Sequence, residues 1–309
     1  MATTRHHLNL RGAVLVTVVA VVALVAPSSA KAYGWPIEPF ERQHPVRGFF
    51  GDPRVGDAHE RGRSFHFGVD ISAPDGTPVY ATLTGTAFID AERRQVVAVR
   101  SGSDPSVVFA YWHIVPTVRS GQAVTAYRTV LGHIARGWAH VHFAEQRNGR
   151  HLNPLRRGAM SPYADRTRPT IHAFRLERRP SALGRHTNGA TFDLVAELSD
   201  DTPVPVARPW SDRPVMPALV RWRIREPERV RPWQTAADFR LGIPPNPLFN
   251  TVYARWTRQN KPWCDGRYGV VLLRGWSLGG SLSGIVTVEI AATDTRGNTA
   301  RRSFTVTVR

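Results

Sequence analysis

The feature that most constrains the fold is a series of short β-rich runs between residues 66 and 145, separated by turn residues. No convincing helical period of apolar residues interrupts these runs. Strands that follow one another without crossover helices must pair mostly antiparallel. We therefore predict an all-β domain, an antiparallel β-sheet or sandwich with a groove lined by strand ends and loops. The candidate strands are residues 78–81, 86–90, 95–99, 107–112, 122–126, 130–134 and 140–144.

Two segments in this region carry side chains that bind zinc. His66 and Asp70 lie four residues apart, and His140 and His142 lie two apart. β-branched neighbours favour a strand for the first segment, and positions four apart on a strand are separated by roughly 13 Å. One metal cannot span that distance, so the segment must bend, and Gly68 is where a bend costs least. His140 and His142 share one strand face, so both pairs can point into one cleft.

The order and spacing of three motifs closely resemble those of the lysostaphin/LytM-type zinc endopeptidases, which cut peptidoglycan peptides and have the duplicated hybrid motif fold. The resemblance covers roughly residues 45–148. It rests on His66-x-Gly68-x-Asp70 with the following Ala73-Pro74 and Gly76-Thr77-Pro78-Val79, on Tyr111-Trp112-His113-Ile114, and on His140-Val141-His142-Phe143. Phe49 to Arg54 also resembles the strand that precedes the metal motif in this family.

The resemblance implies a role for each residue of the set. His66, Asp70 and His142 would bind Zn²⁺ and leave a fourth position open for water, the arrangement of a catalytic zinc. His140 would accept a proton from that water, and His113 would orient it or stabilise the oxyanion of the tetrahedral intermediate. The residues alone leave open which of His140 and His142 binds the metal.

Other residues near these motifs have simpler interpretations. His133 and His151 could contact substrate, but we favour surface or loop positions for both. Trp112 and Trp138 flank the predicted catalytic positions and would form either groove walls or part of the core. The single cysteine, Cys264, has no partner for an internal disulfide.

The first 32 residues have the pattern of a secretory signal peptide. Arg5 and Arg11 precede an apolar run from residue 13 to residue 26, and Ala30-Lys31-Ala32 offers a cleavage site. We expect a secreted or cell-wall-associated protein without stable membrane insertion after cleavage. Removal of the segment lowers the formal charge from +17 to about +14. A protein with this positive charge can bind the acidic polymers of a bacterial envelope. The sequence contains no nucleic-acid-binding motif.

Residues 164–309 are predicted to form a second domain, after a peptidase domain at residues 33–163. Its last segments read as a strand, a turn from Asp294 to Asn298 and a final alternating strand, which resembles the closing hairpin of immunoglobulin-like β-sandwiches. Residues 203–266 are rich in Pro and Trp with few clean strands. We expect them to be an insertion packed over the sandwich or between the domains.

Together these features predict a secreted zinc metalloendopeptidase that hydrolyses amide bonds in peptidoglycan peptides. The C-terminal domain would position it on the wall or on an envelope partner. One alternative is a catalytically silent envelope protein that uses the same fold to bind or activate a cell-wall partner. Another is an adhesin or glycan-binding protein in which the Trp-rich C-terminal part carries the main role.

Overall fold

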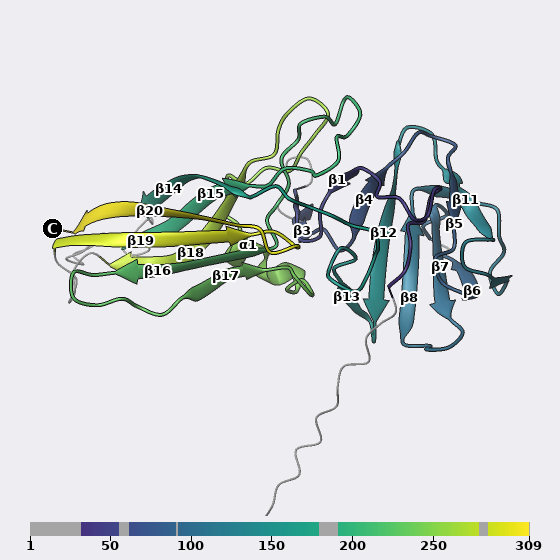
Figure 1. Ribbon diagram of the computed structural model, residues 1–309, viewed down its shortest axis with the longest axis horizontal. Helices are drawn as coiled ribbons and strands as arrows, with labels where there is room; N and C mark the ends of the chain where they lie inside the picture. The colour runs from purple at the N-terminus through teal and green to yellow at the C-terminus, as the bar shows by residue number, and fades with distance from the viewer. Residues whose placement is uncertain (1–31, 56–61, 91, 179–190, 278–283, 309) are drawn as a thin grey trace, which may run out of the picture. The chain divides into compact units, whose positions relative to one another are not determined.

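In the computed structural model the chain is built almost entirely of strands (Figure 1), which form five antiparallel sheets in the part of the chain that is described. The structure describes residues 32–55, 62–90, 92–178, 191–277 and 284–308. Within these ranges every pairing between named strands is antiparallel, as the lack of crossover helices predicts. Their named helical elements are η2 (Asn246–Leu248) and α1 (Phe249–Val252).

The largest sheet has the strand order β1-β4-β12-β8-β7-β6-β10, with β13 paired to β12. β4, β12 and β8 lie side by side in it (Figure 1). Its strands are β1 (Val46–Gly48), β4 (Val69–Ser72), β6 (Gly85–Ile89), β7 (Val96–Ser101), β8 (Val107–Trp112), β10 (Ala123–Val124), β12 (His140–Arg147) and β13 (Arg150–Leu152).

Strand β12 shows why this sheet can carry a site. Side chains alternate between its two faces, so Val141 and Phe143, both fully buried, pack into the hydrophobic core. His140 and His142 therefore occupy the opposite face. Two smaller sheets accompany the large one, with the strands β5 (Pro78–Tyr80), β11 (Val130–Ile134) and β9 (Ile114–Pro116) in one and β2 (Pro53–Arg54) and β3 (Ser64–Phe65) in the other.

Residues 170–308 contribute two further sheets. The three-stranded sheet contains β14 (Thr170–Arg178), β15 (Thr191–Ser199) and β18 (Tyr268–Ser277). The four-stranded sheet contains β17 (Gln234–Asp238), β16 (Leu219–Arg225), β19 (Gly284–Thr293) and β20 (Thr299–Val308). The predicted closing hairpin is present as β19 and β20, which pair along their whole length.

Residues between 203 and 266 do not form a single insertion. Their middle part supplies β16, a central strand of the four-stranded sheet, and β17 beside it, because Leu219 to Arg225 alternates buried and less buried side chains in the manner of a strand. The irregular segments on either side of these two strands contact residues 51 and 52, just before β2. Met216 donates its backbone N–H to Asp52 Oδ1 at 2.8 Å, and the Tyr253 hydroxyl donates to the Gly51 carbonyl at 2.5 Å.

The all-β prediction and the candidate strands of residues 78–144 are confirmed, with boundaries that differ by at most three residues. Residues 31–309 form one compact unit, so the boundary between residues 163 and 164, and the immunoglobulin-like assignment, stay predictions. The predicted signal peptide lies outside the described residues except for its last position. In the described part of the chain, no helix has the length and apolar character needed to cross a membrane.

Candidate metal centre and cleft

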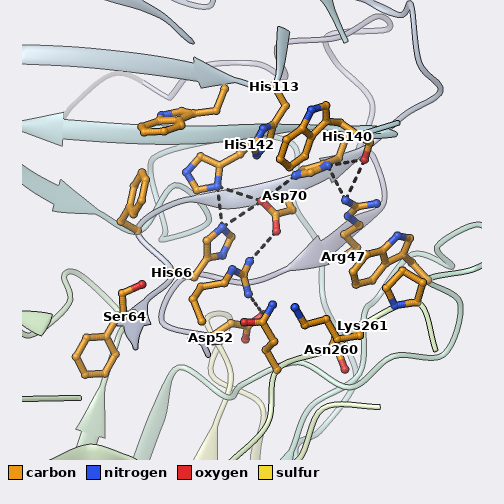
Figure 2. A pocket seen from close by; sticks show the side chains of 18 of the residues that line it. Arg47, Asp52, Ser64, His66, Asp70, His113, His140, His142, Asn260 and Lys261 are labelled. Atoms are coloured by element: carbon orange, nitrogen blue, oxygen red, sulfur yellow. Dashed lines mark hydrogen bonds and ion pairs between the residues drawn. The ribbon is translucent and has the colours of Figure 1, made fainter. Parts of the chain in front are cut away.

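Three of the predicted site residues meet where β4 and β12 pair. The register of these strands places His142 directly opposite Asp70. His66 lies between β3 and β4, and the chain bends after it so that its ring returns to the carboxylate (Figure 2). His66 Nε2 lies 3.1 Å from Asp70 Oδ1, His142 Nδ1 lies 3.0 Å from the same oxygen, and the two nitrogens are 2.7 Å apart.

This arrangement suits a tetrahedral metal ion. Ligand atoms bound at 2.0–2.1 Å to such an ion lie about 3.3 Å apart, so the three atoms would need to move by only a few tenths of an ångström. His66 Nδ1 lies 2.8 Å from the Phe49 carbonyl, which accepts its proton and leaves the lone pair of Nε2 directed at the cluster. Two imidazoles and one carboxylate are a ligand set that zinc accepts.

Asp70 divides its two oxygens between different partners. Oδ1 faces the two imidazoles, whereas Oδ2 accepts a hydrogen bond from Arg54 Nη2 at 2.6 Å. Gly48 makes room for this pair, because a Cβ there would come within 2.5 Å of Asp70 Oδ2. The carboxylate is therefore held in one orientation from outside the cluster.

Gly68 is required at the bend for a reason that differs from the predicted one. Its φ is not in the left-handed region, so backbone freedom does not explain it. A Cβ at this position would instead lie 2.3 Å from the Phe143 carbonyl oxygen and 2.8 Å from His142 Nε2. The absence of a side chain lets the bend approach β12 closely enough for His66 to reach the cluster.

His140 lies next to the cluster, on the same strand face as His142. Its Nε2 is 3.5 Å from Asp70 Oδ1, and its Nδ1 is 2.7 Å from the Trp138 carbonyl and 2.6 Å from Arg47 Nη2. Arg47 also donates to the Trp138 carbonyl at 3.0 Å. The carbonyl and the guanidinium thus fix the outer nitrogen of the His140 ring, and the inner nitrogen faces the cluster.

His113 reaches the same place from the end of β8. Its backbone has φ 66°, in the left-handed region that only a few non-glycine residues adopt. Its ring stacks on Trp138 at a centroid distance of 3.6 Å and an interplanar angle of 14°, and lies 4.7 Å from the His140 ring. The unusual backbone conformation and the stacked indole together hold this imidazole beside His140.

Burial controls the charges of these groups. It lowers the pKa of His66, and lowers the pKa of both His113 and His142 to about 3, so these imidazoles are neutral at neutral pH. Burial alone would raise the pKa of Asp70, but His66, Arg54 and His140 hold it well below its ordinary value. The cluster therefore presents neutral nitrogens and an ionised carboxylate, the protonation states that bind metals.

The five residues line one side of a cleft of about 500 Å³. The opposite side comes from the C-terminal part of the chain, where Asn260 and Lys261 face the histidines across the opening (Figure 2). Aromatic side chains surround the opening: Phe67, Trp112, Trp138, Trp210 and Trp263. The Trp210 ring lies 4.2 Å from the guanidinium carbon of Arg47, which links this wall to His140.

Several of these positions were not predicted. Arg47 has no motif of its own, and residues 259–263 lie in the stretch expected to be an insertion, so nothing in their spacing associates them with the histidines. Trp112 and Trp138 line the cleft and do not belong to the core. His133 lies on β11, in a different sheet. The His151 ring lies 4.7 Å from the Phe67 ring, but His151 does not line the cleft.

Comparison with known proteins places this region in a family. Residues 64–154 match the model of Peptidase family M23. No curated protein matches the chain. Among solved structures, the chain is similar to a zinc-containing peptidase from Vibrio cholerae, with 22% identity over 40% of this chain and 39% of that one and a TM-score of 0.32. It is also similar to Csd3 from Helicobacter pylori, with 20% identity over 40% of this chain and 34% of that one and a TM-score of 0.32.

A third similar structure is the catalytic domain of the prophage-encoded M23 protein EnpA from Enterococcus faecalis. It shows 24% identity over 38% of this chain and 95% of that one, with a TM-score of 0.29. The chain spans less than half the length of the first two of these proteins. The family match falls on the residues that form β3 to β13 and carry the His-Asp-His cluster. Residues 64–154 therefore form a domain of peptidase family M23.

Proposed function

We propose that the chain is a secreted, zinc-dependent endopeptidase that hydrolyses amide bonds in peptidoglycan peptides. The observation that carries this proposal is the convergence of His66 Nε2, Asp70 Oδ1 and His142 Nδ1 at one point of an M23 domain, at the bottom of an accessible cleft. These three residues would hold the zinc ion. Zinc bound there would polarise the scissile carbonyl and lower the pKa of a bound water to about 7.

His140 is suited to move a proton beside this centre. If its Nδ1–H is donated to the Trp138 carbonyl, Nε2 keeps its lone pair on the side of the cluster. Arg47 Nη2 also lies 2.6 Å from Nδ1 and can only donate, so this tautomer requires the guanidinium to direct its proton to the Trp138 carbonyl, 3.0 Å away. His140 would then accept a proton at Nε2 and pass it to the leaving amine.

His113 would act as a hydrogen-bond donor. Because burial keeps it neutral, one of its ring nitrogens carries a proton and the other does not. The stack on Trp138 fixes the plane of the ring next to His140, so the N–H can be directed at negative charge that develops on the substrate oxygen. This is the role of an oxyanion donor.

The cleft walls support a peptide substrate. Tryptophans at the rim offer flat apolar surfaces, and Arg47 and Arg54 place positive charge in the cleft. Stem peptides of peptidoglycan combine small apolar residues with free carboxylates, which matches such a lining. The apolar run and cleavage site of residues 1–32 support export to the wall, where this substrate lies.

The proposal is tested on residues 33–309, incubated with peptidoglycan of several cross-link types with and without a zinc chelator. New peptide termini, detected by mass spectrometry, should be lost on chelation and in His142→Ala. The matched control is His133→Ala, a histidine of a neighbouring sheet outside the cleft, which should retain activity. A fully active His142→Ala protein would contradict the proposal. Bound zinc without cleavage of any substrate would favour a silent envelope protein that binds a partner.

A further inference from the structure

A second group of metal-ligating side chains lies away from the M23 cluster. Asp165 precedes β14, Asp200 follows β15 directly, and Asp294 follows β19 directly. One carboxylate oxygen from each lies within 4.8 Å of the others. The residues are 8%, 1% and 3% exposed, so three carboxyl groups that are far apart in the sequence share one buried place.

Two of the three carboxylates have local hydrogen-bond partners. Asp294 Oδ1 accepts hydrogen bonds from the backbone N–H groups of residues 296, 297 and 298. Asp165 Oδ1 accepts one from the Thr167 backbone N–H and one from the Thr167 hydroxyl. Asp200 differs from them. Its Oδ1 accepts the Asp201 N–H at 2.9 Å, whereas its Oδ2 is buried and has no hydrogen-bond partner. A buried carboxylate oxygen without a partner costs free energy unless a ligand occupies the space beside it.

No ion pair that the structure describes neutralises the group. Among the described residues, no Arg, Lys or His lies within ion-pair distance of these three carboxylates. The nearby Arg296 guanidinium stacks over the Tyr163 ring at 4.6 Å instead. Burial and the neighbouring Asp165 raise the pKa of Asp200 to about 8. Either a proton or a cation must therefore offset the repulsion.

We propose that Asp165, Asp200 and Asp294 bind a calcium ion. All three offer oxygen and none offers nitrogen or sulfur, which favours a hard cation over zinc. Ca²⁺ takes six to eight oxygen ligands in flexible geometry, so three carboxylates from separate loops suit it better than the strict octahedron that Mg²⁺ requires. The ion would lie beside the unpartnered Oδ2 of Asp200.

The ion would join the linker to the C-terminal sheets. Asp165 belongs to the segment that leaves the M23 region, and Asp200 and Asp294 end strands of the two different C-terminal sheets. Asn298 already donates from Nδ2 to the Asp165 carbonyl at 3.0 Å, and Arg157 donates to the Arg296 carbonyl at 2.7 Å. A bound cation would strengthen this contact and with it the placement of the C-terminal residues that wall the cleft.

The test is thermal unfolding of residues 33–309, freed of calcium with a calcium-selective chelator and then titrated with Ca²⁺ to about 10 mM, above the range of extracellular calcium modules. Ca²⁺ should raise Tm by about 3–6 °C, and calorimetry should give one site. Asp200→Asn should abolish this response and have the same or a higher Tm than the wild type without calcium, because it removes the repulsion. Asp201→Asn, an exposed neighbour, should respond as the wild type does.

His142→Ala should keep the calcium response, which separates this site from the proposed zinc centre. An unchanged Tm and no heat at any Ca²⁺ concentration would overturn the proposal in favour of a shared proton. An equal shift in Asp200→Asn, or a shift with Mg²⁺ alone, would also overturn it.

Discussion

Arg54 donates a hydrogen bond to Asp70 through the carboxylate oxygen that faces away from His66 and His142, at 2.6 Å. The inner oxygen is thereby directed at the two imidazole nitrogens. Partners of this kind, one step outside a metal's own ligands, set both the orientation and the basicity of the ligand.

Arg54→Ala should weaken zinc binding by about 10–100-fold, because Asp70 loses the group that orients it. The measurement is competition for zinc against a chromophoric chelator. Arg54→Lys keeps the positive charge but loses the planar fork of the guanidinium. Its zinc affinity should lie between those of Arg54→Ala and the wild type. Unchanged zinc affinity in Arg54→Ala would show that the cluster itself fixes the carboxylate.

Gly68→Ala should destabilise the protein by about 1–3 kcal/mol and reduce its zinc content, because the new methyl group would overlap the Phe143 carbonyl and crowd His142. Denaturant unfolding and metal analysis measure the two effects. Gly102→Ala is the matched control, since its Cβ would find no atom closer than 3.8 Å. It should change stability by less than about 0.5 kcal/mol.

Asp52 should make the protein less stable as pH rises from 4 to 6. Burial raises its pKa from 3.8 to about 6, so the folded state holds a proton that the unfolded state has already released in this window. The loss is of the order of 3 kcal/mol and is complete above pH 6. Unfolding free energies of wild type and Asp52→Asn, measured from pH 4 to 7, should diverge accordingly. Glu92→Gln, at an exposed site, should follow the wild-type slope.

Trp138→Ala should raise the pKa of His113 from about 3 toward its ordinary value of 6.5, because removal of the stacked indole opens the ring to water. Since a positive charge on His113 would oppose the uptake of a proton by the adjacent His140, the acid limb of kcat/KM should move to higher pH. Histidine titration by NMR checks the first effect directly. Trp138→Phe retains a stacked ring and should leave His113 close to its wild-type behaviour.

Trp263→Ala should raise KM about 5–10-fold with little change in kcat, as expected for an aromatic contact worth about 1–1.5 kcal/mol that is made equally in the ground and transition states. The side chain is 76% exposed at the cleft rim, so its removal should not alter Tm. Trp233→Ala, a tryptophan outside the cleft, controls for a general effect of indole loss. An unchanged KM would remove Trp263 from the substrate-binding surface.

The sequence predicts the M23 region well because its signals are local. Alternation, turn residues and the two-residue spacing of His140 and His142 each depend on near neighbours, and strand pairing then brings Asp70 opposite His142. A family resemblance was still needed to distinguish the two histidines, since both lie on one face. Gly68 was correctly associated with the bend, but the reason, a close approach to Phe143, depends on a strand 75 residues away.

Contacts between distant segments were beyond such reasoning. Trp210, Asn260 and Lys261 reach the cleft only through the packing of the C-terminal part, and no spacing rule joins them to His66. The three buried aspartates were missed for the same reason. Asp294 was visible as a turn residue, but its neighbours Asp165 and Asp200 lie about 130 and 90 positions away, so nothing local indicates their meeting.

The far wall of the cleft has a consequence for the order in which the protein matures. All predicted metal ligands have been synthesised by residue 142, yet Asn260 and Lys261 follow more than 100 positions later. A chain that emerges from its N-terminus during synthesis can thus bring the predicted ligands together before the opposite wall exists. We therefore expect a chain that ends before residue 259 to carry the predicted ligands in a groove that lacks its C-terminal wall.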